Sequence, residues 1–270
     1  MKKKIMKAAL LTGAALVLVV ATVLGTIAYL TASSAVANVF TVGNIKISMY
    51  ETKVDTNGEI VTPVTKVDTN SYHLVPGETY VKDPTIYIND TFIHDNGSSD
   101  KMYLFVKSHN QIRNIEAGNQ ENAPVGTPLS MRQQMEANGW VQLARSENGV
   151  EILWVYGTRN INTGEVTPIA VDKNIKQKNL SGQEISGLNA GEFRLCESFT
   201  IDEYADVSVA ASAKVLFSAF AIQTQGFEND AVKAWYAIEE SYPEEGGIVN
   251  PKDPYDRNKD AFWWYTATQQ

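Results

Sequence analysis

Apolar and polar side chains alternate along much of this chain, which is the pattern of strands with one buried face. In the segment 45–50, Ile45, Ile47 and Met49 fall on one face and polar side chains on the other. The run 101–109 is apolar on both faces, which predicts a strand at the centre of a sheet or beneath a covering layer. Further strands are predicted at 80–88, interrupted at Asp83–Pro84, and at 139–144, 150–157, 192–201 and 212–227.

Helical spacing predicts two short helices. In the segment 128–139, Ser130 can cap the helix and Gly139 can end it, with two methionines on one face. In the segment 229–243, four apolar residues at helical spacing follow an Asn–Asp pair and precede Pro243. Such an amphipathic helix is expected to lie over a sheet.

Many short strands and few helices predict a mainly β protein, a jelly-roll-type β-sandwich with two or so short helices packed on it. No linker or repeat divides the chain, so one folded domain is expected. We place a cleaved export segment at 1–28 and an N-terminal extension at 29–40. The sandwich spans 41–243 with a polar excursion around 160–190, and a tail with an aromatic end occupies 244–270.

The first 28 residues have a basic start followed by an uncharged run from Ala8 to Thr31, as in an export signal. If retained, a run of this length could also span a bilayer. Removing residues 1–28 takes away four of the 23 basic residues and none of the 31 acidic ones, which leaves a net charge of −12. This acidic remainder argues against nucleic acid as a partner and limits any membrane contact to the uncleaved segment.

The single cysteine, Cys196, excludes an intrachain disulfide and is interpreted as a small core residue. Neither a phosphate-binding loop nor a nucleophile elbow occurs in the sequence, so we expect no cofactor.

Several blocks of the sequence resemble one family. GTIAYLT at 25–31 and NVFTVGNIKISMYE at 38–51 resemble the export signal and first strand of the TasA and camelysin family of Gram-positive bacteria. The resemblance continues in the blocks SYHLVPGETYVKDPTIYI, YLFVKSHN, MRQQMEANGW and FSAFAIQTQGF. It implies export and cleavage by a SipW-type signal peptidase between Ala28 and Tyr29. The small-residue rule alone offers a rival site after Ala37.

The same resemblance implies a secreted subunit of cell-surface or biofilm-matrix fibres. The N-terminal segment would then be a donor strand that fills a groove on the next copy of the chain, in a head-to-tail homopolymer. Its apolar plugs would be Leu30, Val36, Val39 and Phe40. Other components of the matrix are further partners that this function allows.

A zinc peptidase is the enzymatic alternative, because camelysin-like proteins have been described as metallopeptidases. A zinc site of that class usually places two histidines in H-E-x-x-H, and His73, His94 and His109 are too far apart in the sequence for this. We therefore expect no enzyme and assign no catalytic, cofactor-binding or metal-binding residue.

The aromatic cluster at the C-terminus allows two interpretations. Phe262, Trp263, Trp264 and Tyr265 could form a patch that binds carbohydrate or a partner, or they could close the sandwich as an edge strand. The first interpretation belongs to a second alternative, a monomeric, adhesin-like binding module.

Overall fold

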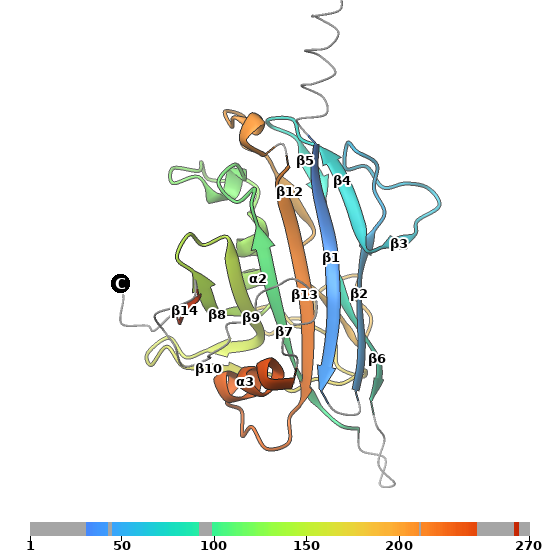
Figure 1. The fold of residues 1–270 in the computed structure, drawn as a ribbon, viewed down its shortest axis with the longest axis vertical. Helices are drawn as coiled ribbons and strands as arrows, with labels where there is room; N and C mark the ends of the chain where they lie inside the picture. Colours follow the sequence, from blue (N-terminus) through green and yellow to red (C-terminus); the bar gives the residue numbers. More distant parts are fainter. Residues whose placement is uncertain (1–30, 43–44, 92–98, 211, 242–261, 265–270) are drawn as a thin grey trace, which may run out of the picture.

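The computed structural model describes residues 31–42, 45–91, 99–210, 212–241 and 262–264 (Figure 1). The predicted export segment, the proposed cleavage site between Ala28 and Tyr29, and the plug residue Leu30 lie outside the described residues. So do His94, Tyr265 and most of the predicted tail. Within the described ranges, no helix is both long enough and apolar enough to cross a membrane.

The described residues form a mainly β structure. Its strands are β1 (Thr31–Val42), β2 (Ile45–Thr52), β3 (Lys66–Val67), β4 (Thr69–His73), β5 (Thr79–Val81), β6 (Thr85–Thr91), β7 (Met102–Asn110), β8 (Trp140–Ser146), β9 (Glu151–Arg159), β10 (Val166–Pro168), β11 (Glu192–Arg194), β12 (Ser198–Thr200), β13 (Lys214–Gln223) and β14 (Phe262–Trp264). The helices are α2 (Met131–Ala137) and α3 (Ala231–Ser241), with short 3-10 turns at Ala117–Asn119 and Val207–Ala210.

One large sheet carries most of the strands, in the order β14-β8-β9-β7-β13-β1-β4, with β10 paired to β9. A smaller sheet, β11-β6-β2-β3, packs against one face of it, and β12 pairs with β5. Ile47 and Ile86 from the smaller sheet share one core with Phe217 of β13. The predicted β-sandwich with few short helices is confirmed.

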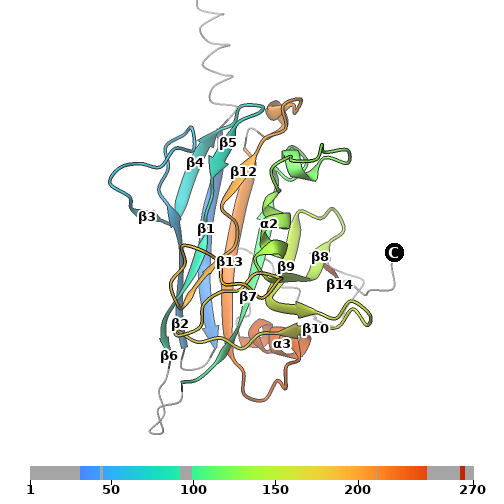
Figure 2. The ribbon, with the colours of Figure 1, turned by 180° about the vertical axis from the view of Figure 1, so that it is seen from behind.

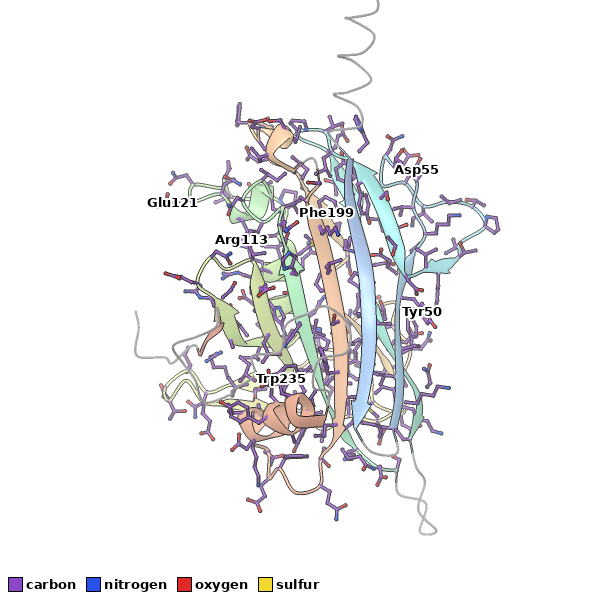
Figure 3. The ribbon with its side chains drawn as sticks, viewed as in Figure 1. Tyr50, Asp55, Arg113, Glu121, Phe199 and Trp235 are labelled. Atoms are coloured by element: carbon purple, nitrogen blue, oxygen red, sulfur yellow. The ribbon has the colours of Figure 1, made fainter. Side chains whose placement is uncertain are left out.

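The two helices lie on opposite faces of the large sheet, as Figures 1 and 2 show together. Helix α2 places Met131 and Met135 in the core between the sheets. Helix α3, which carries Trp235 (Figure 3), covers the other face. The Trp235 ring lies 5.6 Å from that of Phe105 and 5.1 Å from that of Phe220. The large sheet is therefore buried on both faces along its middle, which explains why the first five residues of β7, 102–106, are apolar on both faces.

Both helices begin at the predicted caps. Ser130 Oγ accepts the backbone N–H of Gln133, and the Gln133 side chain in turn accepts the N–H of Ser130. Asp230 accepts the backbone N–H groups of Val232 and Lys233 at the start of α3. These bonds satisfy donors that the first helical turn leaves without a partner.

The prediction of one strand over 192–201 is wrong, because this segment forms β11 and β12 in two different sheets. Strand β11 pairs with β6, and β12 pairs with β5. The partners themselves break at Asp83–Pro84, where proline has no N–H for a ladder. Because β5 and β6 are separate strands, the segment that pairs with them is divided into β12 and β11.

The segment 29–40 was expected to precede the first core strand as an extension. Instead, Thr31–Val42 forms β1 inside the large sheet, and the alternating segment that starts at Ile45 is the second strand. This strand was hard to predict, because the side chains of the segment are short and uncharged. Only one run among them alternates clearly between apolar and polar.

Candidate functional site

The predicted donor segment occupies a slot between two strands of its own chain. Strand β1 runs parallel to β13, with Ser33 opposite Lys214 and Val42 opposite Ile222. On its other side β1 runs antiparallel to β4, with Thr31 opposite His73. Figure 1 shows β1, in blue, beside β13, with β4 on the other side of its N-terminal half.

The two halves of β1 are held differently. Residues 31–35 pair with β4, and residues 33–36 and 39–42 pair with β13, with an irregularity between Val36 and Val39. Among the described strands, residues 33–35 are thus paired on both sides, and the second half of β1 is paired on one side. Three of the predicted plugs, Val36, Val39 and Phe40, lie at paired positions in this register.

The walls of the slot are ordered by contacts that do not involve β1. On β4, Asn70 accepts the backbone N–H of Val54 at 3.0 Å and donates to the carbonyl of Thr52 at 2.8 Å. Tyr72 of β4 donates to the carbonyl of Val81 at 2.9 Å and packs edge-on against Phe199 at 5.2 Å. The contacts of Asn70 tie β4 to the end of β2, and those of Tyr72 tie it to β5 and β12, independently of what fills the slot.

The other wall, β13, is anchored equally well. It pairs with β7 over its whole length, from Val215 opposite Asn110 to Gln223 opposite Met102. Its side chains enter both cores, Phe217 between the sheets and Phe220 beneath α3. A slot bounded by two anchored strands can accept any extended segment that matches its register.

The rival cleavage sites differ sharply in what they leave of β1. A cut after Ala28 leaves the whole strand. A cut after Ala37 removes every residue that pairs with β4 and the first four that pair with β13.

The aromatic end of the chain lies at the opposite edge of the large sheet. Strand β14 pairs antiparallel with β8, with Phe262 opposite Ser146, Trp263 opposite Arg145 and Trp264 opposite Ala144. This agrees with the interpretation as a closing edge strand, and the binding-patch interpretation stays a prediction.

The described histidines do not form a metal site. His73 ends β4, whereas His109 lies on β7 with its Nδ1 3.1 Å from Glu151 Oε1. The hydrogen bond from His109 lowers the pKa of Glu151. Among the residues that the structure describes, no three His, Cys, Asp or Glu side chains are grouped so that they could hold a metal ion.

Cys196 lies in the core and is not a reactive thiol. It is fully buried, its Sγ lies 3.3 Å from the Lys82 carbonyl, and burial raises the pKa of the thiol. The interpretation as a core residue is confirmed.

One buried ion pair lies between the sheets. Lys82 Nζ is 2.5 Å from Glu51 Oε2, and both side chains are 0% exposed. Burial raises the pKa of Glu51, although the positive charge of Lys82 opposes this. No sequence pattern predicts this pair, since the two residues are 31 positions apart.

Sequence analysis also missed a cavity of about 270 Å³ beside α2. Its lining comes from β7, β8, β9, β13, α2 and the segments next to them, and includes Arg113, Arg132 and Arg145. Three separated arginines in three different elements carry no motif, so only the fold brings them together.

Comparison with protein-family models, with curated proteins and with solved structures finds no match. The resemblance to the TasA and camelysin family therefore stays a prediction that rests on the sequence blocks given above.

Proposed function

We propose that this protein is a secreted structural subunit of cell-surface or biofilm-matrix fibres, assembled when β1 moves from its own slot into that of the next copy. The observation that carries the proposal is the position of β1. It lies inside a sheet, pairs with main-chain groups on both sides, and is joined to the rest of the described fold only at its C-terminal end.

Moving β1 from its own slot into that of the next copy leaves the number of main-chain hydrogen bonds unchanged. A second copy offers the same β13 and β4 edges, so each hydrogen bond lost within one subunit is regained between two. Donation from each copy to the next gives an open filament rather than a closed dimer.

Cleavage by a SipW-type peptidase after Ala28 fits this proposal, because it keeps all of β1 available for donation. A cut after Ala37 would shorten the donor to five strand residues, 38–42. Amino-terminal sequencing and electron microscopy of the same secreted sample test this point. We expect a Tyr29 start with filaments, and loss of filaments on deletion of residues 29–38.

A pair of cysteines can lock β1 and test the exchange directly. Ser33 and Ser71 lie opposite each other on β1 and β4, at a spacing that suits a disulfide. In the variant Ser33→Cys/Ser71→Cys, oxidation before assembly is expected to trap monomers and abolish filaments. Assembly under reducing conditions, followed by oxidation, is expected to give a ladder of covalently linked multimers on a non-reducing gel.

A matched control places the same crosslink away from β1. Thr158 and Thr167 are exposed and lie opposite each other on β9 and β10. The variant Thr158→Cys/Thr167→Cys should form filaments in either redox state, without a ladder. Filaments from the locked Ser33→Cys/Ser71→Cys monomer would overturn assembly by β1 exchange.

The second candidate is a monomeric binding module at the cell surface. The observation that favours it is that a single chain already fills its own slot with β1. This function predicts monomers at every concentration and under both redox conditions of the test above.

A further inference from the structure

The cavity beside α2 has an unusual lining for so acidic a protein. It includes three of the six arginines in the chain, Arg113, Arg132 and Arg145. Among the described residues that line it, none is Asp or Glu, although acidic residues outnumber basic ones by 31 to 23 in the whole sequence. A concave site with guanidinium groups and no carboxylate in its lining attracts anions.

Arg113 is held in place at one wall of the cavity (Figure 3). Its Nη1 donates to the carbonyl of Asn148 in the turn between β8 and β9. Gly149 makes room for this, because a Cβ there would lie 2.8 Å from Nη1. A guanidinium has five N–H donors, and this hydrogen bond uses one of them.

The other two arginines come from different elements. Arg132 lies on α2, 43% exposed, and its Nε is 3.7 Å from the Glu136 carboxylate. A pair so exposed is weak and can rearrange when a ligand arrives. Arg145 lies on β8, at the position that pairs with Trp263 of β14.

Side-chain amides add neutral hydrogen-bonding groups to this charge. Asn110, Asn114, Asn119 and Gln142 all line the cavity. Asn110 is fixed because its Nδ2 donates to Glu116 Oε1 at 2.5 Å, and Asn119 is fixed by a 3.0 Å bond to the carbonyl of Arg113. Groups fixed in this way lose little entropy when they bind a ligand.

The remaining lining is apolar and has its polar groups satisfied. Met131, Met135, Ile152, Trp154 and Phe217 are all buried. The indole Nε1 of Trp154 donates to Ser108 Oγ at 2.9 Å, so it needs no partner from a ligand. This part of the lining suits the C–H face of a ring.

We propose that this cavity binds a hexuronate, a sugar ring that carries a carboxylate, as found in acidic polysaccharides. The guanidinium groups match the carboxylate, the amides match the hydroxyl groups, and the apolar lining matches the ring. A simple anion such as phosphate would leave the amides and apolar surface unused. The volume lies near the lower end of the roughly 300–1,000 Å³ usual for ligand pockets, which suits one ring. The proposal stands apart from fibre formation, because a monomer has the whole cavity.

Titration calorimetry on the chain from residue 29 to 270 tests the proposal, with trigalacturonate, a neutral galactose trimer and inorganic phosphate as ligands. We expect trigalacturonate to bind at least tenfold more tightly than either of the others, and more weakly as the ionic strength rises. No binding of trigalacturonate, or equal binding of the neutral trimer, would overturn the proposal. Equal binding of phosphate would overturn it too, since the cavity would then recognise only an anion.

Variants assign the binding to this cavity. Arg113→Gln and Arg132→Gln are each expected to weaken trigalacturonate binding by about tenfold, because each removes a charge-assisted hydrogen bond. Arg132 is half-exposed, so its variant keeps the test valid if Arg113→Gln fails to fold. Lys176→Gln, which removes one positive charge outside the lining, should bind normally. The assignment would be contradicted if the two single variants Arg113→Gln and Arg132→Gln both bound trigalacturonate normally, or if Lys176→Gln bound it more weakly.

Discussion

The two faces of the large sheet each hold a buried lysine paired with a glutamate beside an aromatic ring, yet the pairs differ. Between the sheets, Lys82 and Glu51 are 2.5 Å apart and both 0% exposed, with Lys82 Nζ 5.5 Å from the Phe217 ring. Beneath α3, Lys107 and Glu239 are 3.9 Å apart and 8% and 11% exposed, with Lys107 Nζ 4.9 Å from the Trp235 ring.

The difference shows how a sheet and a helix enclose charge. The layer between two sheets cannot open locally, so the pair there must stay close. Helix α3 covers the other face less completely, so water can reach the edge of the layer beneath it, where Lys107 and Glu239 are 8% and 11% exposed. Burial lowers the pKa of Lys107 and raises that of Glu239, so each of these two groups can become neutral more easily than in water.

The largest effect is expected from breaking the pair between the sheets. Lys82→Ala would leave Glu51 without its cation, and Glu51 Oε1 already has no hydrogen-bond partner within the described structure. We expect the free energy of unfolding to fall by about 3–5 kcal/mol, measured by urea denaturation. The double variant Lys82→Met/Glu51→Gln should recover most of the loss. Equal losses in the single and double variants would show that packing, rather than charge, sets the effect.

Glu116 sharpens the comparison, because this buried acid is bonded to amides instead of a lysine. It accepts from Asn110 Nδ2 and from the backbone N–H of Met131, and burial raises its pKa to about 7. The folded state therefore holds the proton more tightly than the unfolded state. The contribution of protonated Glu116 to the free energy of unfolding is complete below about pH 4.5 and is lost as the pH rises through about 7.

The change over that window is on the order of 3 kcal/mol. Glu116→Gln should flatten the pH dependence of the unfolding free energy between these limits, compared with the wild-type protein. If the unfolding free energy of Glu116→Gln had the same pH dependence as that of the wild-type protein, the group that titrates in this window would not be Glu116. Asp206→Asn is a suitable control, because Asp206 is exposed and its lowered pKa keeps its titration below this pH window.

A smaller effect is expected at the pair beneath α3. Glu239→Gln removes the charge next to Lys107 but leaves the packing of Trp235 on Phe105 and Phe220. We expect a loss of about 1 kcal/mol, because Lys107 lies near the margin and can deprotonate. Hydrogen exchange should show the change in α3 and leave β2 and β6 as they are. If Glu239→Gln lowered the free energy of unfolding as much as Lys82→Ala does, the ion pairs in the two layers would not differ in the way described.

The smallest effect is expected at an exposed pair. His109 and Glu151 are 30% and 35% exposed, so solvent screens them. Because the pKa of Glu151 is lowered, its contribution is present above its unfolded pKa and lost as the pH falls through the folded value. Glu151→Gln should change the unfolding free energy at neutral pH by less than about 0.5 kcal/mol, and less at high salt. A larger change would mean that the pair is shielded from water.

Periodicity predicted the parts of this fold that depend on local pattern. The central position of β7 follows from its apolar run, and the start of α2 follows from Ser130. The partners of each strand depend instead on contacts between distant residues. The break between β11 and β12 is set by Pro84, about 110 residues earlier in the chain.

The candidate sites divide in the same way. The sequence indicated that the segment after Ala28 matters, but it did not show that this segment lies between β13 and β4, since parallel pairing of the first and last long strands leaves no local signal. The cavity needed Arg113, Arg132 and Arg145 to be brought together by β8, α2 and the loop after β7.

The pairing of β1 with β13 also sets an order of events during synthesis and export. The first strand to be made must wait for its neighbour β13, which lies about 180 residues later, and at 5–20 residues per second this is a delay of roughly 9 to 36 seconds. During that interval the edge of β1 that pairs with β13 is open, and a finished slot on another copy competes with one that is not yet complete. Local concentration at the place of export would then decide between a closed monomer and a growing chain of subunits.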